Sequence, residues 1–300
     1  MTLQQLRQVL TIAESNSMNE AAKKLFVSQP NLSATVREVE EDLGITVFMR
    51  NNRGITVTAE GEEFLGYAKQ VVEQYHLLEN RYLNVESKKK FSVSMQHYSF
   101  AVKAFVQLAK EVGMDEYEFA VHETKTKEVI DNVKNLKSEI GVLYLSDFNE
   151  KVLRKLFKEC DIEFKELFTC NTYVYLWKKH PLAGQKEITL DDLQEYPCLT
   201  FEQGVNNSFY YAEEMMSTYE YKRVIKADDR ATMLNLMVGL NGFTLCSGII
   251  SEDLNGDDYA AIPLKESEKM HIGYIKHKGT KLSKLGEIYI CLLYTSDAAD

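Results

Sequence analysis

Apolar residues recur at helical spacing near the N-terminus and predict three short helices. The first covers residues 3–14 and the second runs from Met18 to Phe26. The third follows Ser28, whose hydroxyl can cap it, and Pro30 lies in its first turn, where a missing N–H costs nothing. Gly44 favours the left-handed turn that ends a helix. Polar side chains occupy the N-terminal half of the third helix: Gln29, Asn31, Ser33, Thr35 and Arg37.

A β-hairpin is predicted next, with strands at residues 45–48 and 55–58 and a basic turn that contains Arg50 and Arg53. Two helices joined by a tight turn and followed by a hairpin form a winged helix-turn-helix, whose second helix enters the major groove of DNA. Amide, hydroxyl and guanidinium side chains are the groups that read base edges and hold phosphates. We therefore expect DNA contacts from Lys23, Ser28, Gln29, Pro30, Asn31, Ser33, Thr35, Arg37, Arg50 and Arg53.

A long amphipathic helix is predicted to follow, over about residues 60–86. Its apolar positions are Phe64, Leu65, Ala68, Val71, Val72, Tyr75, Leu78 and Tyr82. Such a stripe cannot be buried by a small domain alone, so the same helix of a second copy is its expected partner. The alternative is that it packs on the C-terminal part of its own chain. This organisation gives a DNA-binding domain at 1–58 and a linker and dimerisation helix at 59–87.

Residues 88–290 alternate between strand and helix patterns, which indicates βαβ units and an α/β module of two lobes. We assign lobe I to about 91–162 and 266–290, and lobe II to about 163–265. Strands are expected at 91–95, 117–122, 139–145, 172–177, 198–201, 223–227, 243–246 and 271–275, and residues 258–262 lead back to the last of these. Helices are expected at 99–112, 125–136, 208–219, 229–238 and 284–290.

Ligands of open α/β sheets bind beyond the carboxyl ends of the strands, where the two lobes meet. Hydroxyls and helix N-termini at these ends can hold a small effector, and aromatic rings suit its apolar part. The candidates are Tyr98, Ser99, Thr124, Thr200, Phe201 and Ser247. We expect His97 to have a structural role and not to act as a base.

Charge is divided unevenly along the chain, whose formal net charge is −10. Residues 1–90 hold 11 Lys/Arg and 12 Asp/Glu, a net of −1, and the remainder holds 24 and 33, a net of −9. The N-terminal third therefore escapes most of the repulsion that an acidic protein exerts on nucleic acid.

No apolar run is long enough to span a bilayer and the first ten residues lack the apolar segment of a signal peptide, so we expect a cytoplasmic protein that does not enter a membrane. The 5 cysteines are scattered and never in CxxC spacing, which argues against a disulfide framework and a metal site. Phosphate-binding, dinucleotide-binding, metalloprotease and hydrolase motifs are missing from the sequence. We therefore expect no catalytic residues, no cofactor and no metal.

The order and spacing of several short motifs are similar to those of LysR-type transcriptional regulators. The matching stretches are Leu6–Ala13, Ser17–Leu25, Val27–Ser33, Val39–Gly44, Phe48–Arg50 and Val57–Gly61. In the C-terminal part, Val238–Leu245 is close to the family's Gly-Leu-Gly element. The resemblance is specific over residues 1–65 and weaker beyond them.

The resemblance implies a winged helix-turn-helix, a linker helix and a two-lobed effector domain like the periplasmic binding proteins. It also implies a sequence-specific DNA-binding regulator controlled by a small molecule bound between the lobes. Expected partners are double-stranded DNA, the effector, further copies of the chain in a dimer and tetramer, and RNA polymerase. The alternative is a small-molecule binding protein whose N-terminal domain serves only oligomerisation.

The C-terminal end departs from this plan. The helical pattern that begins at Lys284 stops after Ile290, and residues 291–300 do not continue it. We interpret 291–300 as a non-native tail and expect disorder or irregular packing there.

Overall fold

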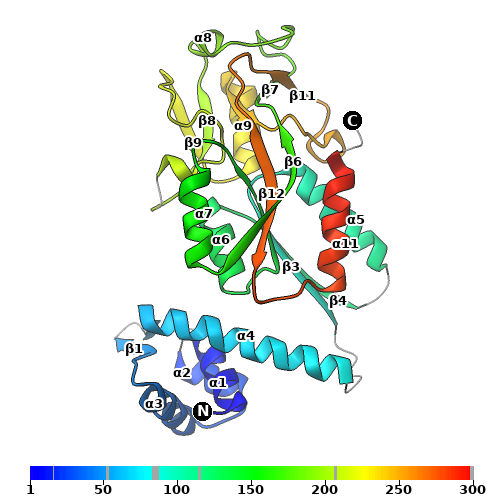
Figure 1. Ribbon diagram of the computed structural model, residues 1–300. Coiled ribbons are helices and arrows are strands. Elements are labelled where there is room, and N and C mark those ends of the chain that lie inside the picture. The colour runs from blue at the N-terminus through cyan, green and yellow to red at the C-terminus, as the bar shows by residue number, and fades with distance from the viewer. Residues whose placement is uncertain (16, 52–53, 83–87, 114–115, 206–207, 298–300) are drawn as a thin grey trace. The chain divides into compact units, whose positions relative to one another are not determined.

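The computed structural model describes the chain in six stretches (Figure 1), which are residues 1–15, 17–51, 54–82, 88–113, 116–205 and 208–297. The chain divides into two compact units, Met1–Ser87 and Lys88–Asp300. Within the described stretches, no helix is both long enough and apolar enough to cross a membrane.

The first unit opens with α1 (Leu3–Ala13), α2 (Met18–Lys24) and α3 (Gln29–Leu43). Serine hydroxyls start the second and third of these helices. The backbone N–H of Glu20 donates to Ser17 Oγ over 3.2 Å, and that of Asn31 donates to Ser28 Oγ over 3.4 Å. α3 ends at Gly44, whose φ of 68° is the left-handed conformation that glycine adopts readily. The sequence prediction of a helix-turn-helix is confirmed.

A hairpin of β1 (Phe48–Asn51) and β2 (Gly54–Val57) follows, with antiparallel pairing. Glu40, near the end of α3, holds it in place, because its Oε1 accepts the backbone N–H groups of Val47 at 2.7 Å and Phe48 at 3.0 Å. The core between the three helices and the hairpin consists of Val9, Ile12, Met18, Ala21, Ala22, Leu32, Val36, Val39, Val47 and Phe48.

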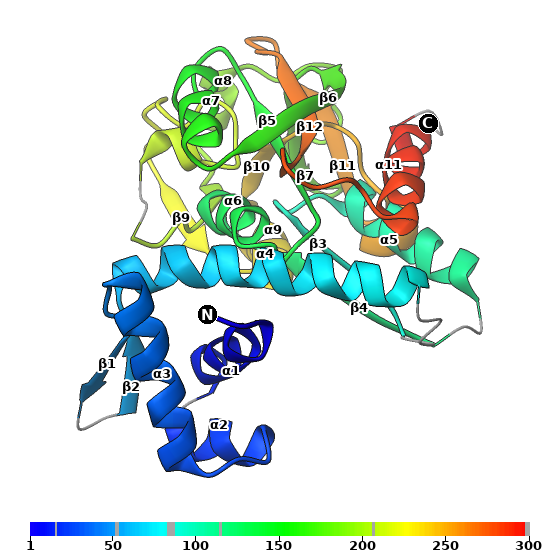
Figure 2. The ribbon, with the colours of Figure 1, turned by 60° about the horizontal axis from the view of Figure 1, so that its bottom comes forward.

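The long helix α4 (Ala59–Tyr82) packs along α1, as Figure 2 shows within this unit. Ala68 and Val72 of α4 are buried against Leu6 of α1. A second set of apolar side chains on α4 stays exposed: Tyr67, Val71, Tyr75 and Leu78. The end that the sequence predicts, about residue 86, lies outside the described residues.

Lobe I of the second unit is built on a sheet with the strand order β4-β3-β5-β12-β6, in which β3 runs parallel to β4 and β5. β12 is antiparallel to both of its neighbours. The helices α6 and α7 cover one face of this sheet, and α5 and α11 lie side by side on the other (Figure 1). The elements are β3 (Lys89–Met95), α5 (Ser99–Val112), β4 (Tyr117–Glu123), α6 (Thr126–Lys134), β5 (Ile140–Leu145), α7 (Glu150–Glu159), β6 (Ile162–Cys170), β12 (Met270–His277) and α11 (Lys284–Asp297).

Lobe II has the strand order β11-β7-β10-β8-β9, and β8 runs parallel to β9 and β10. The chain crosses from lobe I to lobe II after β6 and returns before β12, so two connections join the lobes. One apolar cluster continues from lobe I into lobe II, since Tyr144 and Leu176 both belong to it. The elements are β7 (Tyr173–Trp177), α8 (Leu190–Leu193), β8 (Cys198–Phe201), the 3-10 helix η1 (Phe209–Tyr211), β9 (Val224–Ala227), α9 (Arg230–Leu240), β10 (Phe243–Cys246), α10 (Glu252–Asn255) and β11 (Tyr259–Pro263).

Two expectations for this unit are wrong. Strand β6 pairs with β12 along its whole length, so it belongs to the sheet of lobe I and the predicted boundary between 162 and 163 comes one strand too early. The helix predicted at 208–219 is reduced to the short η1. Beyond η1 the chain leaves helical geometry, and both Glu213 and Glu214 become buried. Their burial, Glu213 against lobe I and Glu214 within lobe II, determines the conformation of this segment, and not local propensity.

The expectation of irregular packing at the C-terminal end is also wrong for the described part. Helix α11 continues through Ile290 to Asp297, and residues 298–300 lie outside the described residues. Leu293 is fully buried in the main apolar cluster. One turn earlier, Tyr289 is buried and donates its hydroxyl hydrogen to the carbonyl oxygen of Ala101 over 3.0 Å. Residues 291–297 therefore continue α11, and Leu293 anchors this part of the helix in lobe I.

We expect the change Leu293→Ala to lower the free energy of unfolding by about 2–5 kcal/mol, because it leaves a cavity in this cluster. Urea unfolding followed by Trp177 fluorescence measures the change. The neighbouring exposed Cys291 supplies the control, and Cys291→Ala should change the free energy by less than about 0.5 kcal/mol. Equal values for the two variants would show that α11 does not pack here in solution.

Candidate DNA-reading helix and interlobe cavity

The polar residues of α3 and its flanks lie at the surface of the first unit, as the sequence predicts. Lys23, Ser28, Pro30, Asn31 and Arg37 are exposed, whereas Gln29, Ser33 and Thr35 are half-buried. The opposite face of α3 carries the buried Leu32, Val36 and Val39.

Short contacts link polar neighbours along the exposed face of α3. Gln29 Nε2 donates to Ser33 Oγ over 2.9 Å, one turn further along the helix. The Thr35 hydroxyl donates to the carbonyl oxygen of Asn31 over 3.2 Å. The face therefore presents amide, hydroxyl and guanidinium groups on a rigid element, which is the chemistry that reads base edges.

The structure describes neither of the arginine side chains that are predicted for the hairpin. Arg50 lies in β1 opposite Ile55 of β2, and the structure does not describe its side chain. Arg53 lies outside the described residues. Their contribution to a DNA-binding surface stays a prediction.

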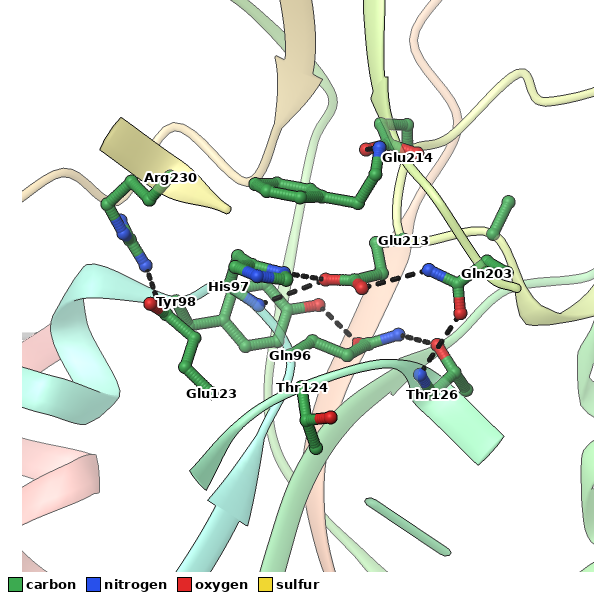
Figure 3. A network of polar contacts seen from close by, with 12 residues as sticks. Gln96, His97, Tyr98, Glu123, Thr124, Thr126, Gln203, Glu213, Glu214 and Arg230 are labelled. Atoms are coloured by element: carbon green, nitrogen blue, oxygen red, sulfur yellow. Dashed lines mark hydrogen bonds and ion pairs between the residues drawn. The ribbon is translucent and has the colours of Figure 1, made fainter. Parts of the chain in front are cut away.

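In the second unit, buried polar side chains gather where β3 ends (Figure 3). Gln96 is almost fully buried and is hydrogen-bonded through both ends of its amide. Its Nε2 donates to Thr126 Oγ1 over 2.6 Å, and its Oε1 accepts from the Tyr98 hydroxyl at 3.0 Å and from the backbone N–H of Tyr144 at 3.2 Å. Gln96 thus joins the ends of β3 and β5 to the start of α6.

Glu213 of lobe II carries this network across to lobe I. One of its oxygens, Oε2, lies 3.0 Å from the backbone nitrogen of His97 and 2.7 Å from His97 Nδ1. The other accepts from Gln203 Nε2 at 2.9 Å, and Gln203 Oε1 in turn accepts the backbone N–H of Thr126 at 3.1 Å. The side chains of His97 and Glu213 are only 7% and 5% exposed, so this link between the lobes is largely shielded from bulk solvent.

Further contacts between the lobes surround this link. The rings of His97 and Phe201 stack with centroids 3.6 Å apart and an interplanar angle of 3°. Arg230 forms an ion pair with Glu123 at a more exposed position (Figure 3). Lys125 lies 3.6 Å from Asp228.

Glu214, next in the chain, points its carboxyl group into lobe II. Its Oε1 accepts the backbone N–H of Phe201 at 2.8 Å. Burial, with the adjacent Glu213 charge as a second cause, raises the pKa of Glu214 to about 8. The carboxyl group of Glu214 is therefore protonated at neutral pH, and it can donate as well as accept a hydrogen bond.

A cavity of about 80 Å³ lies beside these residues. Four of the predicted effector residues, Tyr98, Ser99, Phe201 and Ser247, line it. The other two predicted effector residues, Thr124 and Thr200, are not part of the lining. Much of the lining is apolar and comes from α9 and the segment after β10: Met233, Leu234, Met237, Ile249 and Ile250.

The sequence prediction missed several residues of this site: Tyr175, Glu213, Glu214, Arg230 and Thr244. The two glutamates gave no sequence signal, because an acidic pair in a predicted surface helix is ordinarily exposed. Ser99 was expected to face a ligand, but its Oγ accepts the backbone N–H of Ser251 at 3.2 Å. Thr124 donates its hydroxyl hydrogen to Glu128.

Cysteine and metal chemistry find little support at this cavity. Burial raises the pKa of the Cys246 thiol in the lining to about 12, so the reactive thiolate form is rare at neutral pH. Among the residues that the structure describes, no cluster of His, Cys, Asp and Glu side chains could hold a metal ion.

Comparison with known families agrees with both units. Residues 3–62 match the family described as "Bacterial regulatory helix-turn-helix protein, lysR family". Residues 114–288 match the "LysR substrate binding domain". The second match alone spans more than half of the chain, and the chain belongs to the LysR family of bacterial transcriptional regulators.

Individual relatives match over nearly the full length. The transcriptional regulator CysL of Bacillus subtilis is 25% identical over 300 residues, covering 96% of this chain and 95% of the relative. A variant of full-length OxyR from Pseudomonas aeruginosa has the same fold, with a TM-score of 0.67 at 18% identity and 98% coverage of both chains. CbnR, a LysR family regulator, has a TM-score of 0.59 at 18% identity and 99% coverage of both chains.

As a member of this family, the chain is a DNA-binding transcriptional regulator with an effector-binding domain. The predicted family, fold class and function are confirmed.

Stability should depend on pH through Glu214. The folded chain keeps a proton on Glu214 up to about pH 8, whereas the pKa of this side chain returns to its ordinary value of 4.5 once the chain unfolds. Between these two values the unfolded chain releases the proton first, so the free energy of unfolding falls as the pH rises. This stability is fully present below about pH 4.5 and is lost above about pH 8.

The change Glu214→Gln mimics the protonated carboxyl group. We expect it to remove a loss on the order of 2–4 kcal/mol between pH 5 and 9, measured by urea unfolding at a series of pH values. The exposed Glu220 supplies the control, and Glu220→Gln should leave the pH dependence of the native chain unchanged. A pH dependence that survives in Glu214→Gln would assign the loss to other groups.

Proposed function

We propose that α3 of this regulator reads the edges of base pairs in the major groove, and that the β1–β2 hairpin holds the neighbouring backbone. The exposed polar face of α3, on a helix whose other face is anchored by Leu32, Val36 and Val39, carries this proposal. The contacting residues are Lys23, Ser28, Gln29, Pro30, Asn31, Ser33, Thr35, Arg37, Arg50 and Arg53. Structural likeness to CbnR, which is known also in complex with its target DNA, supports it.

The functional parts of the chain follow from this proposal. Residues 1–58 bind DNA, 59–87 join two copies, and 88–290 form the effector domain, which the α11 residues up to Asp297 complete. The effector binds in the interlobe cavity, with Tyr98, Ser99, Phe201 and Ser247 in its wall and Thr124 and Thr200 outside it.

We assign no catalytic activity to the chain, because its matched relatives are regulators. Its place of action is the cytoplasm, where bacterial DNA is found. Dimers pair into tetramers through the effector domains, and the DNA-bound assembly contacts RNA polymerase.

The change Arg37→Ala tests the proposed DNA contact. We expect it to weaken binding to a duplex selected from a random pool by about 1–3 kcal/mol, because the exposed guanidinium at this position reaches base or phosphate. Fluorescence anisotropy at several salt concentrations measures the affinity and its salt slope. Arg154→Ala, which removes an exposed arginine from the second unit, is the matched control and should bind as tightly as the native chain. Equal affinity for both variants would contradict the placement of α3 on DNA.

The exposed stripe of α4 should hold two copies together. Val71 and Leu78 are 51% and 55% exposed, so charged residues there disrupt a pairing surface without touching the core of the unit. We expect the double change Val71→Lys and Leu78→Lys to halve the mass measured by light scattering after size exclusion. Gln74→Lys adds a positive charge to an exposed position of the same helix and should leave the mass unchanged. If the double variant keeps the native mass, α4 does not form the interface.

A further inference from the structure

We infer that the carboxyl group of Glu213 permanently occupies an anion site between the lobes, formed by the backbone N–H and Nδ1 of His97 and by Nε2 of Gln203, which we call the carboxylate seat. We also infer that the effector is a small uncharged molecule with a hydroxyl or carbonyl group. This inference rests on the proposed function, since it concerns the effector of the same interlobe cavity. It states which chemical class the cavity accepts and which class it excludes.

The seat has the properties of a built anion site. Its donors are the backbone N–H of His97 at 3.0 Å, His97 Nδ1 at 2.7 Å and Gln203 Nε2 at 2.9 Å. Because a carboxylate only accepts hydrogen bonds, Nδ1 carries the hydrogen. These donors come from the loop between β3 and α5 and from the segment after β8, and the glutamate that they hold comes from a third place in the chain.

Hydrogen bonds to the residues before and after Glu213 hold it in this seat. The Tyr144 hydroxyl donates to the carbonyl oxygen of Ala212 over 3.0 Å, and Glu214 is bound to the backbone of Phe201. A group fixed in this way competes at an effective concentration that a free ligand cannot match at millimolar levels. An external carboxylate that entered the seat would displace Glu213. The Glu213 carboxylate would then lose its hydrogen-bond donors while it is still shielded from bulk solvent, which costs free energy.

The charges around the remaining cavity also exclude an anion. Two carboxyl groups, those of Glu213 and Glu214, lie in its wall, and the guanidinium of Arg230 is already paired with Glu123. A ligand carboxylate placed there would lie beside the Glu213 carboxylate, and the one guanidinium in the wall already has an acidic partner. A cationic ligand is disfavoured as well, because the Glu213 carboxylate is satisfied by its own donors.

One polar atom of the wall points to an uncharged hydrogen-bonding ligand. Thr244 is only 6% exposed, and its Oγ1 has no hydrogen-bond partner within the described part of the chain. A buried hydroxyl without a partner costs free energy that a ligand hydroxyl or carbonyl can recover. Because Thr244 lines the cavity beside Met233 and Met237, the recovered bond lies next to an apolar wall.

The cavity volume limits the size of the ligand. A cavity of about 150 Å³ holds benzene, and the interlobe cavity is smaller, at about 80 Å³. The ligand is therefore a short-chain alcohol, ketone or amide, as long as the lobes keep this arrangement.

Thermal unfolding of the full chain at constant ionic strength tests the inference, with propionate and propionamide as probes of nearly equal shape. For the native chain we expect saturable stabilisation by propionamide and none by propionate beyond that of chloride. Glu213→Ala should lower the Tm by about 5–10 °C, because it leaves three donors without an acceptor. Propionate should restore part of that loss saturably, since it fills the emptied seat, and the exposed control Glu220→Ala should behave like the native chain.

Three outcomes overturn the inference. Saturable stabilisation of the native chain by propionate shows that the seat is open to external carboxylates. A folded Glu213→Ala variant that propionate does not stabilise shows that no carboxylate seat exists. If the native chain responds to neither probe, the assignment of the ligand class is wrong.

A second variant covers the case in which Glu213→Ala does not fold. Glu213→Gln keeps the shape of the side chain but loses the charge, so hydrogen exchange of the His97 and Thr126 amides should become at least tenfold faster, while exchange in β12 stays unchanged. Unchanged exchange at His97 and Thr126 overturns the inference. None of these measurements involves DNA, so a chain that passes them but binds no duplex contradicts the proposed function and leaves the carboxylate seat intact.

Discussion

The effector domain depends on one buried carboxyl group, that of Glu213, whose oxygens accept hydrogen bonds from three donors between the lobes. An unpaired charge in so buried a place would cost several kcal/mol. The requirement that Glu213 be satisfied therefore fixes how lobe II meets lobe I. It also explains why His97 stacks on Phe201 and why Gln203 reaches Thr126, since each of these contacts belongs to the same buried network.

The polar residues that matter for function are at the surface in the first unit and buried in the second. In the first unit the polar side chains of α3 are exposed or half-buried at the surface, so they stay available to a partner. In the second unit the polar side chains of the network around Glu213 are buried, and they find their partners inside the protein. An effector can influence DNA binding only through different affinities for two arrangements of the assembly. The hydrogen-bond network around Glu213 stiffens the contact between the two lobes, so it limits the number of arrangements that the assembly can adopt.

Local patterns predicted most of the helices and strands. Ser17, Ser28 and Gly44 mark helix ends through short-range chemistry, and the structure places those ends within a residue or two. Predictions failed where distant contacts decide. The segment after Ser208 has the composition of a helix, yet it unwinds so that Glu213 and Glu214 can reach the interior. Strand β6 was assigned to the wrong lobe because its partner, β12, lies about a hundred residues further along the chain.

The sequence by itself determined the helix-turn-helix, its polar reading face and the family, because caps, turn residues and apolar spacing act between residues that are close in the chain. Only the tertiary structure decided the chemistry of the effector cavity. Its lining comes from segments between His97 and Met270, and which of their side chains are buried depends on how the two lobes close. A glutamate has no fixed role in a sequence, since its charge, its partners and its pKa are set by the surroundings that the fold provides.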